Sequence, residues 1–186
     1  MVIPQRNEEP LMTGEELARR PDLHCELVDG RVVPMPMTGH VHGTIEAKLG
    51  AKLVAYADRT GRGIAMTGEV GIYIRHDPDT VRGSDALFIS HERYARRGPY
   101  TFLDVAPELV VEVYSPDDRP GEAMKKIREY LAIGVDRVWY VDPRRRQVRI
   151  YRAPEQMETL GLSDVLQDEE ILPGFSLPLA ELFGVG

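Results

Sequence analysis

The chain has 186 residues, of which 42% are hydrophobic and 28% are charged, and its formal net charge is -7 at pH 7. This length favours a single domain, no segment reaches the roughly 20 apolar residues that cross a bilayer, and a single cysteine, Cys25, excludes an internal disulfide. The acidity also argues against tight, non-specific binding of nucleic acid through a uniformly basic surface. The N-terminus lacks a basic start followed by an apolar run, so we expect a cytoplasmic protein without membrane contact.

The N-terminal third begins with a polar segment, residues 1–12, that contains two prolines and is predicted to be a loose arm ahead of one domain, 13–183. Residues 13–20 start with a threonine and continue with helix formers, which predicts a short capped helix. In residues 24–35, apolar positions flank Asp29-Gly30, the strongest short signal for a β-hairpin.

The middle of the chain shows a change of periodicity from helix to strand. Residues 41–58 carry apolar side chains at spacings of four, four and three, which predicts an amphipathic helix. The apolar positions are Ile45, Leu49, Leu53 and Tyr56. Residues 69–75 alternate apolar with polar or small residues, as a half-buried strand does, and residues 85–90 form a short apolar strand.

The most hydrophobic strand is predicted over residues 108–115, and Glu112 interrupts its apolar run. A loop (115–121) and a helix (122–134) follow. Strands are predicted at 136–142 and 147–153, around an arginine-rich turn, and then short strands and a final helical turn.

The order of elements predicts the architecture. A helix between two strands suggests a crossover connection, and therefore a mixed sheet covered by helices in an α/β or α+β fold. The central strands are expected at about 69–75, 85–90, 108–114 and 137–141, with helices 41–58 and 122–133 packed on the sheet.

Asp85 and Glu112 are the first candidates for chemistry, because each lies on a predicted strand near the centre of the sheet. A charged carboxylate there is costly unless it is paired, hydrogen-bonded or bound to a metal. Two carboxylates on adjacent strands could hold one hard cation with backbone carbonyls and water. The alternative is an ordinary ion pair, for instance to Arg82 or Lys126.

Three weaker candidates lie on other elements. Lys126 follows Glu112 by fourteen residues, on the next predicted helix, although periodicity does not separate it cleanly from Lys125. His42, at the start of the first long helix, could ligate a metal or transfer protons, but such a histidine more often packs locally. Glu26, in the first hairpin strand, could be a third acidic ligand.

Several motifs together resemble the Uma-two family of bacterial proteins, which are regarded as endonucleases of the PD-(D/E)XK, restriction-endonuclease-like superfamily. The resemblance covers about residues 13–183. The motifs are ELVDG (26–30), His42-Gly43, RGSD (82–85), PELVVEVYSPDDR (107–119), KIREYLAIGV (126–135), VWYVDP (138–143) and LPGFSLPLAELF (172–183).

The resemblance implies roles for the candidate residues. Asp85 matches the acid of the Pro-Asp motif, Glu112 the second acid, and Lys126 the lysine that this family carries on the following helix. Glu26 and His42 match further family positions.

Two positions depart from the superfamily pattern. Ser84 stands where the motif has proline, and Tyr114 stands where the wider superfamily has its lysine. Proline brings no ligand, so the first departure should spare the chemistry. The second makes activity depend on whether Lys126 reaches the site.

The implied function is hydrolysis of nucleic-acid phosphodiester bonds, with DNA the expected substrate. Asp85 and Glu112 would ligate Mg²⁺, or Mn²⁺ as a substitute, with help from the Val113 carbonyl. A homodimer would suit cleavage of two strands. The alternatives are a non-catalytic binding or assembly module that keeps the fold, and a metal-dependent hydrolase of a small phosphate ester.

Overall fold

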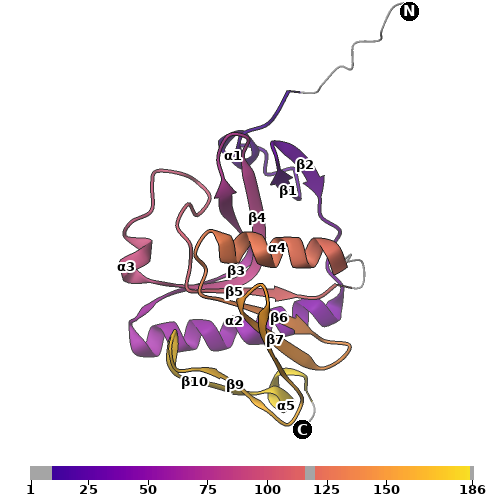
Figure 1. Cartoon of the computed structure of the whole chain (residues 1–186), viewed down its shortest axis with the longest axis vertical. Coiled ribbons are helices and arrows are strands. Elements are labelled where there is room, and N and C mark those ends of the chain that lie inside the picture. Colours follow the sequence, from indigo (N-terminus) through magenta and orange to yellow (C-terminus); the bar gives the residue numbers. More distant parts are fainter. Residues whose placement is uncertain (1–9, 116–119, 185–186) are drawn as a thin grey trace, which may run out of the picture.

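The computed structural model describes residues 10–115 and 120–184, which form a mixed sheet flanked by helices, with an N-terminal hairpin at one edge (Figure 1). The predicted fold class is confirmed. In chain order the elements are α1 (Gly14–Ala18), β1 (Cys25–Val28), β2 (Arg31–Pro34), α2 (His40–Thr60), β3 (Gly63–Arg75), β4 (Thr80–Ser90), α3 (His91–Tyr94), β5 (Leu109–Val113), α4 (Pro120–Ala132), β6 (Arg137–Asp142), β7 (Gln147–Ala153), β8 (Gln156–Leu160), β9 (Val165–Asp168), β10 (Leu172–Pro178) and α5 (Leu179–Leu182).

The main sheet has the strand order β2-β1-β4-β5-β6-β7-β8, and β3 also pairs with β4. Its strand pairs are antiparallel except for β5 and β6, which run parallel and are connected through α4. Such a crossover must pass over one face of the sheet. It therefore carries α4 back across β5 and brings the helix over the strand that holds Glu112.

Alternation along the strands divides the core into two layers. In β5, Val111 and Val113 pack with α2 and with the small β9–β10 sheet, whereas Val110 packs with Ile127 and Tyr130 of α4. Each strand thus presents successive residues to opposite faces. The sheet is consequently covered by α2 on one face and by α4 on the other.

The predicted elements agree with the structure in type, but β3, expected among the central strands, pairs with β4 alone among the described strands and lies off the main strand order. Both long strands begin earlier than expected: β3 at Gly63 rather than 69, and β4 at Thr80 rather than 85. Helix α4 begins at Pro120 inside the predicted loop, because proline is tolerated in the first turn of a helix. Most of the predicted arm and the loop residues 116–119 lie outside the described residues.

A β-bulge interrupts β3 opposite Asp85, in the middle of β4. The pairing register shifts between Thr67 and Val70, and the intervening Gly68 and Glu69 have φ angles of 88° and 59°. Positive φ is ordinary for glycine but uncommon for glutamate. The bulge bends β3 beside α2, close to the residues described below.

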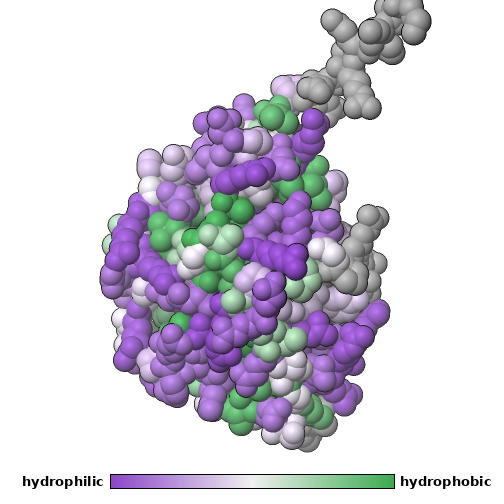
Figure 2. All heavy atoms as spheres, in the orientation of Figure 1, coloured by the Kyte–Doolittle hydropathy of each residue, from purple (hydrophilic) through white to green (hydrophobic). Residues whose placement is uncertain are grey.

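The face that carries α4 is mostly hydrophilic, with hydrophobic residues in small groups (Figure 2). Across the described parts of the chain, no helix is both long enough and apolar enough to span a bilayer.

Gly63 gives a test of the β3–β4 packing. A Cβ at this position would overlap the carbonyl oxygen of Ile89 on the neighbouring strand. We expect Gly63→Ala to lower the free energy of unfolding by about 1–3 kcal/mol, the usual cost of overpacking. Urea denaturation measures the loss.

The control is Gly43→Ala in α2, where a Cβ meets no heavy atom within 4 Å. Alanine is favoured over glycine in a helix by roughly 0.5–1 kcal/mol, so this variant should gain stability. Equal effects of the two substitutions would contradict the packing described for Gly63.

Candidate active site

Asp85 lies where the pairing of β4 with β5 ends. The register joins Ala86 to Val111, and beyond this pair the Asp85 carboxylate accepts a hydrogen bond from the Val113 amide at 2.5 Å. The residue is only 8% exposed. A backbone donor therefore holds this nearly buried carboxylate against the C-terminal end of β5.

Glu112 is held by two residues of α4 that are four positions apart. Lys126 Nζ donates to Glu112 Oε2 at 2.8 Å, and Tyr130 Oη lies 2.9 Å from Glu112 Oε1. Residues four apart share one face of a helix, so both groups reach the same carboxylate. The crossover that places α4 over β5 thus supplies a lysine and a tyrosine to Glu112.

A second carboxylate contacts the same lysine. Glu26 Oε1 lies 3.0 Å from Lys126 Nζ, and Glu26 Oε2 accepts a 2.7 Å bond from Arg82. Arg82 also bonds Glu129 of α4 at 2.7 Å through Nε. The result is a chain of alternating charges that joins β1, β4, β5 and α4.

The electrostatics of this chain follow from burial and from its alternating charges. Burial pushes the pKa of Glu112 upward and the nearby Asp85 adds to the rise, whereas the Lys126 ammonium opposes it and favours the ionised carboxylate. Burial alone would lower the pKa of Lys126, but the carboxylates of Glu112 and Glu26 outweigh it and raise that pKa. Lys126 therefore stays a cation at neutral pH.

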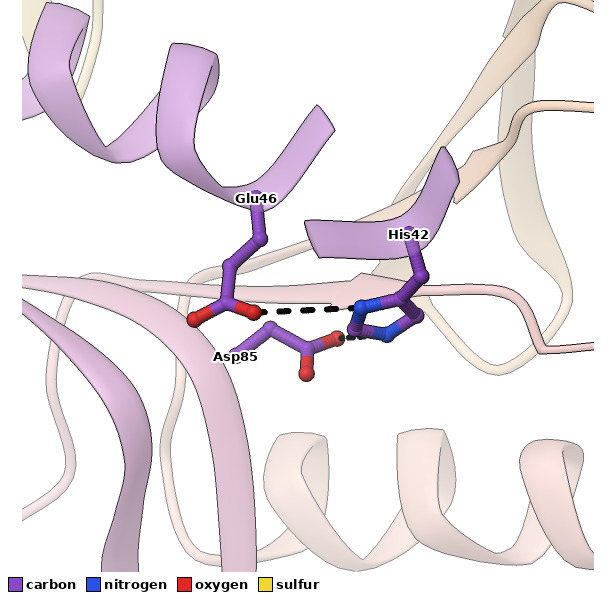
Figure 3. A group of neighbouring side chains, drawn as sticks. All are labelled: His42, Glu46 and Asp85. Atoms are coloured by element: carbon purple, nitrogen blue, oxygen red, sulfur yellow. Dashed lines mark ion pairs between the residues drawn. The ribbon is translucent and has the colours of Figure 1, made fainter. Parts of the chain in front are cut away.

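On the α2 side, Asp85 faces the side chains of His42 and Glu46 (Figure 3). His42 Nε2 is 3.5 Å from Asp85 Oδ2, and His42 Nδ1 is 3.8 Å from Glu46 Oε2. His42 and Glu46 are one helical turn apart on α2. Burial and the nearby Asp85 raise the pKa of the Glu46 carboxyl.

The candidate residues predicted from the sequence open onto one cleft of about 200 Å³. The lining includes Met35 and Met37 from the connection between β2 and α2, and Tyr140 from β6. The candidate residues that line the cleft are Glu26, His42, Asp85, Glu112, Val113 and Lys126.

The structure distinguishes the two neighbouring lysines. Lys126 is 18% exposed and reaches Glu112, whereas Lys125 is 47% exposed and lies 3.9 Å from Glu129. All the residues singled out from the sequence therefore meet in one place, while their roles remain predictions.

Sequence reasoning missed three contributors to the site. Glu46 follows His42 by four residues and Tyr130 follows Lys126 by four, so helical spacing was the signal that could have found them. Arg82 was considered only as an alternative partner for a carboxylate, and it proves to be 4% exposed and bonded to Glu26 and Glu129.

Comparison with known protein families assigns the chain to one of them. The model of the Uma2 family, described as "Putative restriction endonuclease", matches residues 13–180. The chain belongs to this family, and family membership supports a nuclease function in general.

A solved structure has the same fold. It is that of a "putative nuclease belonging to DUF820" from Anabaena variabilis ATCC 29413, with a TM-score of 0.78, 19% identity, and coverage of 94% of this chain and 98% of that one. The expected nuclease-type fold is thereby confirmed. No curated protein matches the chain.

Arg82 provides a test of the buried charge chain. Arg82→Met would leave Glu26 and Glu129 without their guanidinium partner, and breaking a buried ion pair costs about 3–5 kcal/mol. We expect a loss of that order in urea unfolding.

The matched control is Arg20→Met, since Arg20 pairs with Asp22 on the surface, with side-chain exposures of 50% and 61%. Exposed pairs contribute roughly 0–1 kcal/mol. If both variants lost the same small amount, the chain of charges around Arg82 would not stabilise the fold.

Proposed function

We propose that this protein is a metal-dependent endonuclease that hydrolyses phosphodiester bonds of nucleic acid, with DNA as substrate and Mg²⁺ as its ion, for which Mn²⁺ can substitute. The observation that carries the proposal is the part-buried Glu112–Lys126 contact at 2.8 Å beside the buried Asp85 carboxylate. Family membership supports the same class of reaction.

The donor atoms present fit a hard divalent cation. Asp85, Glu112 and the Val113 carbonyl offer only oxygen, which is the ligand type that Mg²⁺ prefers. Each carboxylate has about four lone-pair positions, so Glu112 can keep its bonds to Lys126 and Tyr130 while it also ligates an ion. Asp85 and Glu112 would be the two charged ligands.

A bound ion of this kind supplies a Lewis acid for the phosphate oxygen and lowers the pKa of an associated water. The residues of the chain do the rest. Lys126, kept protonated by its carboxylate neighbours, places a positive charge where negative charge grows on the phosphate. Its role is therefore that of a cation that orients and stabilises, rather than that of a general base.

Neighbouring residues fix these groups in place. Tyr130 orients Glu112, and Glu26 holds the Lys126 ammonium from the other side. Hydrolysis forms a bond from the water oxygen to phosphorus and breaks the bond from phosphorus to a sugar oxygen, which leaves with a proton. A preorganised cation loses no energy in reorganising during this step.

The two departures from the superfamily pattern are compatible with this proposal. Tyr114 donates its backbone amide to the Val141 carbonyl and packs against Tyr140, so it serves β5 and its neighbour. Lys126 supplies the amine from α4 instead. Ser84 is fully buried within β4 and leaves Asp85 at the cleft.

A plasmid-nicking assay with Mg²⁺ and with Mn²⁺ tests the proposal. Asp85→Ala should abolish nicking, because it removes the carboxylate that faces both sides of the site. Glu112→Gln should do nearly the same. Lys126→Ala should lower the rate by about 10²–10³, the usual effect of losing one preorganised charge-stabilising group, while metal binding is kept.

Lys125→Ala is the control, since it removes an exposed lysine from the same turn of α4. Its rate should match that of the original protein. Equal losses in the two lysine variants would remove Lys126 from the mechanism. Metal binding without cleavage of DNA or RNA would instead favour a non-catalytic module, and cleavage of small phosphate esters alone would favour the third alternative.

A further inference from the structure

His42 and Glu46 occupy successive turns of α2 and both face the strand that carries Asp85 (Figure 3). Helical geometry places residues four apart on the same side. Because α2 packs on the sheet through Ile45 and Leu49, which lie beside this pair in the sequence, the two side chains are directed at β4. Two elements distant in the chain thus present three metal-ligating groups to one point.

The spacing of these groups suits an ion. One ligand atom from each of His42, Glu46 and Asp85 can be chosen so that all three lie within 4.8 Å of one another. The contacts of 3.5 and 3.8 Å to His42 are longer than good hydrogen bonds. Metal–ligand bonds of about 2.0–2.2 Å would need only small side-chain rotations to join all three.

The bulge in β3 contributes to this arrangement. The backbone amide of Gly68 lies near the Glu46 carboxylate and acts to lower its pKa, against the larger effect of burial. A partner that orients a ligating carboxylate is typical of the surroundings of metal sites. The register shift of β3 therefore contributes to the arrangement of Glu46, because it turns the Gly68 amide towards α2.

The nitrogen of His42 decides which ion fits. Mg²⁺ binds through oxygen and keeps much of its water, whereas imidazole suits first-row transition metals. A set of one imidazole and two carboxylates therefore favours an ion such as Mn²⁺ over Mg²⁺.

We infer that His42, Glu46 and Asp85 form a second metal position, selective for a transition-metal ion such as Mn²⁺, on the α2 side of the site. Asp85 then lies between two ions, since it also faces Glu112 and Val113 on the β5 side. This inference extends the proposed function, from which it takes the position between Asp85 and Glu112. It adds Glu46 as a ligand and makes Mn²⁺ the preferred ion at one of the two positions.

Metal binding tests the inference without any substrate. Titration of the full chain with Mn²⁺, followed by calorimetry and by the electron paramagnetic resonance of free Mn²⁺, should give two ions per chain. Glu46→Gln should weaken one of the two at least about tenfold, since losing even a partner of a ligand costs 10–100-fold. Mg²⁺ titrations of the same variant should be unchanged.

A spectroscopic signature identifies the histidine. Pulsed electron paramagnetic resonance of bound Mn²⁺ should show coupling to one imidazole nitrogen, and His42→Gln should remove it. His40→Gln, which alters an exposed histidine two residues earlier on α2, should keep the coupling. Because His42 is buried and its variant could misfold, Glu46→Gln, with a side chain only partly buried, provides the second test.

Distinct outcomes separate this inference from the proposed function. A single Mn²⁺ per chain without nitrogen coupling, or unchanged Mn²⁺ binding in Glu46→Gln, would overturn the second position, even if the protein nicked DNA with Mg²⁺. Two bound ions with nitrogen coupling, in a protein that cleaves no nucleic acid, would uphold the second position and overturn the proposed endonuclease.

Discussion

The structure depends on the neutralisation of carboxylates that stand on a buried sheet. Unpaired, a charge in such a place costs several kcal/mol, and Glu26 and Glu112 are both largely buried there. The Lys126 ammonium lies between them, and Arg82 bonds Glu26 from the other side. These contacts hold α4 against β1, β4 and β5 in one arrangement, so the same charges that would do the chemistry also determine how the layers fit together.

Local sequence patterns were enough to predict several elements of the fold and one residue of the candidate site. The Asp29-Gly30 pair turns the hairpin, with φ of 54° and 71° at the two residues, because few residues tolerate that conformation. The long helix was visible from its apolar spacing. Glu112 stood out because a charge inside an apolar strand needs a specific partner. The family resemblance supplied what the pattern could not, namely the choice of Lys126 over Lys125.

Long-range pairing was not predictable in the same way. Arg82 meets Glu129 and Glu26 across 47 and 56 residues of chain, and no local periodicity indicates which strand neighbours which. The sequence of α2 alone does not show that Glu46 faces β4, because that strand comes from a later part of the chain. The early start of β3 was missed for a related reason. Glycine usually indicates a turn, but Gly63 pairs with Ser90 in the sheet, and the close approach of the neighbouring strand leaves no room for a side chain there.

The hairpin at the sheet edge has a dynamic consequence. Among the described residues, the strand register of β1 with β4 contains one pair, Leu27 and Val81. The outer strand of the hairpin, β2, is exposed along its whole length. Short, solvated edge elements open at lower free energy than a sheet's centre. Such an opening withdraws Glu26 from Lys126 while the Glu112 contact, only fourteen residues away in the chain, persists. The Glu26–Lys126 contact would then be lost by partial unfolding before the core melts, so the loss of this contact and global unfolding should occur at different temperatures.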